Sequence, residues 1–204
     1  MPSSILEPCP WVIARARTMG LRSILDVGTG YGRWGALLRE YLDVWDFNYN
    51  RATWTRVIDG IEINPEMLGP NRGHYDAVWY EDARTRTKSL RDDETTYDAV
   101  LCSDVLEHLE KPDGTELLAN MAALAENYLI LSTPVGDWLG NAHGENESDK
   151  HLSIWEVKDF MVPGKETKYV SAPLLLDAGL TLADLARWDT PSGRVLSVIY
   201  KRGA

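Results

Sequence analysis

Cysteine is scarce in this sequence of 204 residues, which contains only Cys9 and Cys102. Two cysteines build no disulfide framework and their spacing fits no zinc site, so we expect a reducing compartment, the cytoplasm. Long hydrophobic runs are also absent, since no segment approaches the roughly 20 apolar residues of a membrane span. Residues 1–11 lack the basic and then apolar pattern of a secretory signal. The sequence therefore predicts a protein that is neither exported nor inserted into a membrane.

Positive charge is in deficit, with 21 basic against 31 acidic residues and a net charge of −10. Such a surface repels phosphate groups, which disfavours RNA and anionic membranes as partners. A charged surface can still contain one basic groove, and Arg84, Arg86, Lys88 and Arg91 form a local basic cluster. The alternative is that this cluster is a solvated helix face. No repeat, low-complexity tract or linker divides the chain, so residues 1–204 are predicted to form a single domain.

Short hydrophobic runs alternate with helical patterns along the chain. The runs at residues 24–27 and 99–101 are nearly continuous, as in strands that are covered on both faces. Apolar residues at three- and four-residue spacing predict helices over 32–41 and 113–126. The alternation predicts a doubly wound α/β protein with a parallel sheet, and turn residues at 191–193 add a C-terminal antiparallel hairpin. The expected strands are residues 23–27, 56–61, 77–80, 97–102, 128–132, 180–188 and 194–200.

Three alternate glycines follow the first expected strand, in the segment D-V-G-T-G-Y-G at residues 26–32. Glycine is needed where the chain turns sharply and its backbone approaches a ligand beside a helix N-terminus. Proteins that bind a nicotinamide dinucleotide contain the pattern G-x-G-x-x-G, and Gly30, Gly32 and Gly35 match it. Gly30, however, comes two residues after the strand has ended, whereas that fingerprint closes the strand with its first glycine. Asp26 also suits a cationic ligand better than a pyrophosphate.

The D-x-G-x-G-x-G pattern resembles the first motif of the class I S-adenosylmethionine-dependent methyltransferases. Further motifs of that family follow in order: D-G-I-E-I-N at 59–64, E-D-A at 81–83, a segment at 97–108 that ends in D-V-L-E-H, and L-I-L-S-T-P at 129–134. The resemblance implies a Rossmann-like sheet of six parallel strands and one antiparallel strand. It also implies methyl transfer from S-adenosylmethionine, and the acidity of the chain favours an oxygen or nitrogen of a small molecule as acceptor.

The same resemblance assigns the cofactor-binding residues. Glu62 ends the second strand and would accept hydrogen bonds from both ribose hydroxyls, for which two carboxylate oxygens are well suited. Asp82 would accept from the adenine amino group, although Glu81 stands where the family has a glycine. The whole expected set is Asp26, Gly28, Thr29, Gly30, Gly32, Glu62, Ile63, Asp82, Ala83 and Ser103.

Acids and histidines after the fourth expected strand are the candidates for chemistry. Asp104, Glu107 and His108 have the spacing of one face of a helical turn. His108 is the best general base, because the pKa of an imidazole lies near neutral pH, and a structural histidine bound to Glu107 or a carbonyl is the alternative. With His151, the segment also resembles metal-dependent RNA 2′-O-methyltransferases, which implies a site for Mg, Mn or Zn. The implied metal ligands are Asp104, Glu107, His108 and His151, and the implied catalytic residues are His108, Asp104 and His151.

Three functions stay open at this point: a small-molecule methyltransferase, a metal-dependent RNA 2′-O-methyltransferase, and a non-catalytic nucleoside-binding protein. A nicotinamide-dependent dehydrogenase is a distant fourth. The polar residues 136–150 are predicted to form a mobile lid. Trp138 and Trp155 would floor an acceptor pocket or anchor that lid in the core. The aromatic-rich insertion at residues 43–54 is expected to pack on the outer helices.

Overall fold

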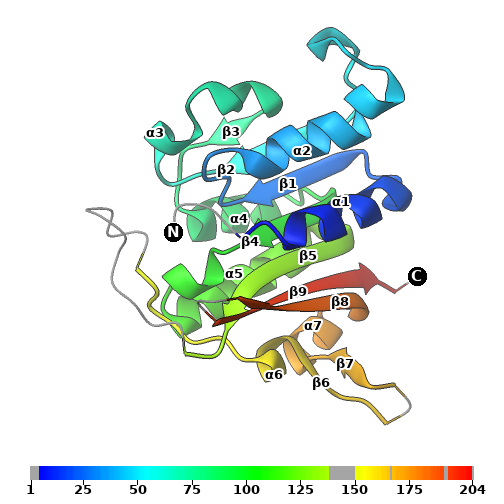
Figure 1. Ribbon diagram of the computed structural model, residues 1–204. Helices are drawn as coiled ribbons and strands as arrows, with labels where there is room; N and C mark the ends of the chain where they lie inside the picture. Colours follow the sequence, from blue (N-terminus) through cyan, green and yellow to red (C-terminus); the bar gives the residue numbers. More distant parts are fainter. Residues whose placement is uncertain (1–4, 138–149, 166, 191–192, 204) are drawn as a thin grey trace.

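The sheet of this protein has seven strands in the order β3-β2-β1-β4-β5-β9-β8, with helices on both faces (Figure 1). The computed structural model describes residues 5–137, 150–165, 167–190 and 193–203. β9 is antiparallel to both of its neighbours, and the other pairs are parallel. The doubly wound α/β fold predicted from the sequence is thereby confirmed. The strands of this sheet are β1 (Ser23–Val27), β2 (Val57–Ile61), β3 (Val78–Trp79), β4 (Tyr97–Ser103), β5 (Ala125–Val135), β8 (Leu180–Thr190) and β9 (Gly193–Arg202).

Each face of the sheet has its own layer of helices, because the central strands are apolar on both sides. The first layer contains α1 (Pro8–Met19) and α2 (Arg33–Leu42), which pack on one buried cluster of side chains. The second contains α4 (Ala83–Asp92) and α5 (Lys111–Leu124), which pack on another. The shorter helical elements are α3 (Pro65–Leu68), α6 (Val157–Phe160), α7 (Pro173–Asp177) and the 3₁₀ turns η1 (Val44–Asp46), η2 (Arg51–Thr53), η3 (Gly69–His74) and η4 (Leu106–His108).

The register of the parallel strands brings their carboxyl ends to one edge. Val27 at the end of β1 pairs with Ile61 at the end of β2 and with Cys102 in β4. The loops that follow these strands therefore leave the sheet side by side. Ligands of open α/β sheets bind outside the carboxyl ends of the strands, so this edge is where a site is expected.

Two parts of the chain differ from the sequence prediction. A second sheet pairs β6 (Met161–Pro163) with β7 (Tyr169–Ser171), and strands of three residues are too short to show a periodic pattern. β5 begins at Ala125, inside the range predicted as helix, because α5 ends one residue earlier. The predicted C-terminal hairpin is present as β8 and β9, although residues 191–192 of its turn lie outside the described residues.

The insertion at residues 43–54 was expected to pack on the outer helices, and two of its four aromatic side chains do so. The Trp45 ring stacks on Tyr41 of α2 with centroids 6.0 Å apart, and Arg39 of α2 lies 4.5 Å from the centre of the Trp54 ring. Trp45, Phe47 and Tyr49 are 56%, 78% and 71% exposed. The segment is also anchored by polar contacts. Arg51 donates to the carbonyl of Tyr75 at 2.8 Å, so the insertion supports the backbone of the chain after η3.

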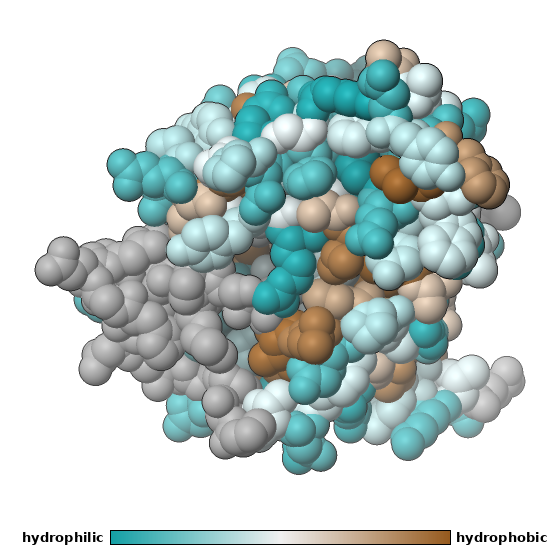
Figure 2. Space-filling model, turned by 45° about the horizontal axis from the view of Figure 1, so that its top comes forward, coloured by the Kyte–Doolittle hydropathy of each residue, from teal (hydrophilic) through white to brown (hydrophobic). Residues whose placement is uncertain are grey.

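The visible face of the molecule in Figure 2 is largely hydrophilic, and its hydrophobic residues form small separate groups. In the part of the chain that the structure describes, no helix combines the length and the apolar character that crossing a bilayer requires.

Candidate active site

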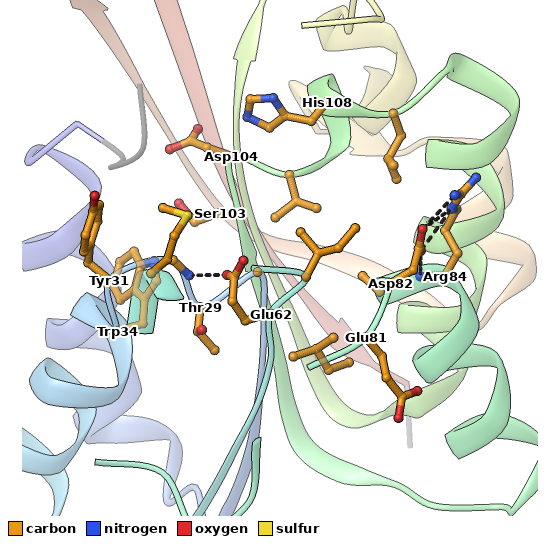
Figure 3. A pocket seen from close by; sticks show the side chains of 18 of the residues that line it. Thr29, Tyr31, Trp34, Glu62, Glu81, Asp82, Arg84, Ser103, Asp104 and His108 are labelled. Atoms are coloured by element: carbon orange, nitrogen blue, oxygen red, sulfur yellow. Dashed lines mark hydrogen bonds and ion pairs between the residues drawn. The ribbon is translucent and has the colours of Figure 1, made fainter. Parts of the chain in front are cut away.

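A cavity of about 700 Å³ opens at the carboxyl edge of the sheet. Its wall comes from the loops after β1, β2, β3 and β4, with Leu152 from the later part of the chain. In Figure 3, Tyr31 and Trp34 lie on one side, Asp82 and Arg84 on the other, and Glu62 between them. The wall includes these predicted cofactor-binding and catalytic residues: Gly28, Thr29, Gly30, Glu62, Ile63, Asp82, Ala83, Ser103, Asp104 and His108.

The glycine loop packs directly against the loop after β4. Gly28 has a left-handed φ of 80°, and a Cβ atom there would lie 2.3 Å from Cγ2 of Val105. The backbone N–H groups of Gly28 and Thr29 both donate to the carbonyl of Ile61, at 2.9 and 3.0 Å. Glycine is required at position 28 for both conformation and space, as the motif predicts.

Glu62 connects the glycine loop to the end of β2. Its Oε2 accepts from the backbone N–H of Gly30 at 2.7 Å, and its Oε1 accepts from that of Asn64 at 2.9 Å. The side chain is buried and lines the cavity. Each carboxylate oxygen can accept more than one hydrogen bond. Glu62 can therefore hold the loop and still accept from a ligand hydroxyl.

Asp82 is fixed by an arginine that sequence patterns did not single out as a site residue. Arg84 donates through Nε and Nη2 to the Asp82 carboxylate, at 3.0 and 2.7 Å, and through Nη1 to Asp113 on α5. All three side chains line the cavity. The Arg84 hydrogen bonds hold the pKa of Asp82 below its ordinary value, so Asp82 is a charged acceptor. Arg84 thereby links the two helices on this side of the cavity.

The basic cluster on α4 is only partly a solvated helix face. Arg84 faces the cavity, and Arg86 lies over the Trp79 ring at 4.1 Å. Arg91 donates to Asn120 at 2.6 Å and pairs with Asp92 at 2.8 Å. Lys88 and Arg91 are exposed, as expected of a solvated helix face.

Two of the predicted cofactor-binding residues, Asp26 and Gly32, lie outside the cavity wall. Asp26 is fully buried beneath the glycine loop, where its Oδ2 accepts from the Tyr75 hydroxyl at 2.6 Å. The pKa of Asp26 is raised to about 7 in total, mainly by burial. The hydrogen bond from the Tyr75 hydroxyl lowers this pKa, and the nearby charge of Glu62 raises it. Gly32 is the N-cap of α2. Sequence position alone could not separate loop residues that face the cavity from those beneath it.

A helical turn, η4, does follow β4, but it does not bring Asp104, Glu107 and His108 to one face, because Asp104 precedes it with a left-handed φ of 55°. Asp104 and His108 line the cavity, whereas Glu107 points inward, is 2% exposed and accepts from the Thr133 hydroxyl at 3.1 Å. Burial, together with the charge of Asp104, raises the pKa of Glu107 well above its ordinary value.

His151 follows residues 138–149 in the chain and lies beside His108 and Glu107. The imidazole rings of His108 and His151 have centroids 4.8 Å apart and meet edge to face. Ligand atoms of Glu107, His108 and His151 lie within 4.8 Å of one another, and Asp104 does not belong to this group. Three of the four predicted metal ligands thus come together.

The predicted lid lies largely outside the described residues, as does Trp138. Trp155, the alternative floor of an acceptor pocket, is 2% exposed and packs against Phe160 with ring centroids 5.4 Å apart. Lys111 lies 3.6 Å from the centre of its ring. Trp155 therefore anchors the segment after residue 150 in the core. This is the anchoring role expected from the sequence, and not the role of a pocket floor.

Some buried polar atoms at and under the cavity lack a hydrogen-bond partner among the described residues. Thr29 Oγ1 and Trp34 Nε1 belong to residues of the wall, and Asp26 Oδ1 lies beneath it. Buried polar groups are normally satisfied, so these atoms leave hydrogen-bonding capacity unused at the cavity.

Comparison with known proteins gives one family and many similar folds. A family model described as a methyltransferase domain matches residues 10–163. The search of curated proteins found no match.

Several solved structures superpose on nearly the whole chain. Magnesium protoporphyrin IX methyltransferase from Synechocystis PCC 6803, with bound SAM, is 19% identical with a TM-score of 0.59, over 97% of this chain and 77% of that one. The methyltransferase domain of bacterial CtHen1-C is 17% identical with a TM-score of 0.62, over 97% of each chain. The 1,6-didemethyltoxoflavin-N1-methyltransferase of Burkholderia thailandensis is 16% identical with a TM-score of 0.65, over 97% of this chain and 77% of that one. At these identities the likeness is one of fold.

Proposed function

The chain belongs to the class I S-adenosylmethionine-dependent methyltransferases, whose domain model matches residues 10–163, and from this we propose that it methylates an oxygen or nitrogen of a small molecule. The observation that carries the proposal is the cavity at the carboxyl edge of the sheet. There the loops after four strands bring the glycine loop, Glu62, Asp82 and His108 to one space. We also propose that the chain is one domain and acts in the cytoplasm, where its two buried free cysteines stay reduced.

The cofactor residues divide the wall into parts that suit different parts of S-adenosylmethionine. Glu62 and Ile63 would hold the ribose, and Asp82 with Ala83 the adenine. The glycine loop and Ser103 would hold the methionine end. The unpartnered Thr29 Oγ1 and Trp34 Nε1 at the wall support a polar ligand here. S-adenosylmethionine supplies a methyl group bonded to a positively charged sulfur.

When bound, the cofactor would pass its methyl carbon to the acceptor atom, and the electron pair of the broken bond would stay on sulfur. His108 takes the proton that the acceptor loses. Its Nδ1 lies 3.0 Å from the carbonyl oxygen of Lys150, which can only accept. Nδ1 is therefore the protonated nitrogen of the neutral ring, and Nε2 is the basic one. Asp104, also in the wall, would orient the acceptor, and His151 would hold the His108 ring.

The test is a methyl-transfer assay with S-adenosylmethionine and a panel of phenols and amines as acceptors. We expect His108→Ala to lower turnover by about 10²–10⁴-fold with near-normal affinity for S-adenosylhomocysteine. His74→Ala, which changes a histidine outside the cavity wall, should leave both unchanged. Wild-type turnover in His108→Ala would reject the base. Binding of the cofactor without transfer to any acceptor would favour a non-catalytic nucleoside-binding protein.

A second candidate function rests on the cluster of Glu107, His108 and His151, which suits a divalent metal. If Mg, Mn or Zn binds there, it would lower the pKa of an acceptor hydroxyl, as expected of an RNA 2′-O-methyltransferase. The test measures melting temperature and turnover with each metal and with EDTA, in the wild type and His151→Ala. A metal-dependent rise that His151→Ala abolishes would support the metal site, and salt-sensitive binding of an RNA oligonucleotide would favour RNA as acceptor. No response to metal would leave His108 as the base.

A further inference from the structure

Tyr75 lies directly beneath the glycine loop. Its side chain is fully buried, although it comes from the segment after η3 and the loop lies between β1 and α2. A Cβ atom at Gly35 would lie 2.4 Å from the Tyr75 ring, and one at Gly60 would lie 3.0 Å from it. Gly35, which completes the apparent G-x-G-x-x-G pattern, is therefore explained by this ring rather than by a pyrophosphate.

The Tyr75 hydroxyl makes two hydrogen bonds in opposite senses. It accepts from the backbone N–H of Gly35 at 3.0 Å and donates to Oδ2 of Asp26 at 2.6 Å. Asp26 Oδ1 has no partner among the described residues. The tyrosine thus joins the first turn of α2 to a buried carboxylate that is only partly satisfied by the protein.

We propose that Tyr75 is a positioning residue, which fixes Asp26 beneath the glycine loop so that its negative charge favours a cationic sulfonium ligand over the neutral thioether left after methyl transfer. This inference rests on the proposed function, because it needs S-adenosylmethionine in the cavity. It adds a role in discrimination between substrate and product, which the cofactor motifs do not assign.

The physical reason is that S-adenosylmethionine and S-adenosylhomocysteine differ by one methyl group and one positive charge. Adenosine, ammonium and carboxylate are common to both, so their contacts cancel in the ratio of the two affinities. A fixed charge in a poorly solvated site interacts with a nearby charge more strongly than it would in water. Once the sulfur is neutral that attraction is gone, which helps the product to leave.

The charge on Asp26 depends on the groups that face it. The pKa of Asp26 is raised to about 7 in total, mainly by burial. The hydrogen bond from Tyr75 lowers this pKa, and the charge of Glu62 at the end of β2 raises it. Burial raises the pKa of the Cys102 thiol on β4, and the charges of Glu107, Asp26 and Asp104 raise it further, so this thiol stays protonated. Loss of the Tyr75 hydroxyl removes the contact that favours the charged form, so Asp26 would hold its proton to higher pH.

The experiment measures calorimetric affinities for S-adenosylmethionine and S-adenosylhomocysteine between about pH 6 and about pH 8.5, on either side of the expected Asp26 titration. In the wild type we expect the ratio of affinities to rise in favour of S-adenosylmethionine, by about threefold or more, as Asp26 ionises. In Tyr75→Phe, which keeps the ring, the rise should move to higher pH. In Asp26→Asn, the ratio should stay low at every pH.

Tyr97→Phe is the matched control, because Tyr97 donates to the buried Asp59 at 3.0 Å and neither residue lines the cavity. It should keep the wild-type ratio and its pH dependence. A ratio that does not vary with pH in the wild type, or an unchanged profile in Asp26→Asn, would overturn the proposal. If Tyr75→Phe does not fold, Asp26→Asn still decides the question. Failure of the wild type to bind either compound would instead reject the proposed function.

Discussion

Two buried tyrosines donate to two buried aspartates in this protein, one on each face of the sheet. Tyr75 donates to Asp26 on the face that α1 and α2 cover, and Tyr97 donates to Asp59 on the face that α4 and α5 cover. Burial is the main cause that raises the pKa of both carboxyls. The chemistry of the two pairs is therefore closely matched.

The pairs differ in what happens to the second carboxylate oxygen. In Asp59 it accepts from the backbone N–H of Ala77 at 2.9 Å, so both oxygens are bound within the fold. In Asp26 it has no partner among the described residues, and the nearest loop is the one that forms the cavity wall. A buried polar group that the fold leaves incomplete is costly. The comparison teaches that the fold satisfies the Asp59 pair completely and leaves the Asp26 pair incomplete, which is consistent with the proposed role of Asp26.

The largest expected difference is in how stability depends on pH. The folded-state pKa of Asp26, about 7, is above the ordinary value of 3.8. Between these values the unfolded chain releases the proton and the folded protein keeps it, so the free energy of unfolding falls as pH rises. We expect Asp26 to contribute a fall on the order of 3 kcal/mol between about pH 4 and about pH 7.

Urea denaturation at about pH 5 and about pH 8 measures this fall, which should be much smaller in Asp26→Asn. At the higher pH this variant should also be more stable than the wild type, since it removes a buried charge with an unbound oxygen. Equal pH slopes for the two proteins would contradict the assignment.

Glu62→Ala should weaken binding of S-adenosylmethionine by about 1–3 kcal/mol, because it removes the acceptor for the Gly30 N–H and for the ligand hydroxyls. It should also lower the pKa of Asp26, whose value the Glu62 charge raises. Calorimetry across the same pH range measures both effects. Glu66→Ala, at an exposed position on α3, is the control and should bind normally.

Asp59→Asn should destabilise the protein by about 1–2 kcal/mol. The amide NH₂ of the asparagine is a donor, and it would face another donor, either the Ala77 N–H or the Tyr97 hydroxyl. The ratio of S-adenosylmethionine to S-adenosylhomocysteine affinity should not change. Chemical denaturation and calorimetry on one preparation separate the two readouts. A changed ratio would mean that the two pairs are not distinct in role.

The smallest effect is expected for Tyr97→Phe, which should cost about 1 kcal/mol of stability at neutral pH. The ring still fills its place in the core, and Asp59 keeps the Ala77 N–H. Thermal unfolding detects this as a lower melting temperature. An unchanged melting temperature would show that the Tyr97 hydroxyl contributes nothing to the fold.

Local sequence patterns predicted the sheet and part of the cavity wall. Runs such as residues 24–27 and 99–101 are continuous because both of their faces are buried, and that pattern is visible without a structure. The site followed from the sheet, because parallel strands end at one edge, and the polar residues after β1, β2 and β4 had to meet there.

Contacts between distant segments were not predictable in this way. Tyr75 is 49 residues from Asp26, and no local period connects them. From its spacing in the sequence, Arg84 is expected on the surface of a helix. Its contact with Asp113 on the neighbouring helix α5, which holds it in the cavity wall, could not be read from the sequence. Asp104 departs from the expected helical turn because one backbone angle is left-handed, which a residue pattern does not encode.

The close fit between Gly35 and Tyr75 has a consequence for how this chain can change over evolutionary time. A methyl group at position 35 has no room while the phenol ring is in place, and the ring cannot move because it is fully buried. The two positions should therefore covary: among homologues, a side chain at position 35 is expected only together with a smaller residue at position 75. In such homologues the aspartate below the glycine loop would lack the hydrogen bond from a tyrosine hydroxyl. We therefore expect their methylation product to inhibit them to a different extent.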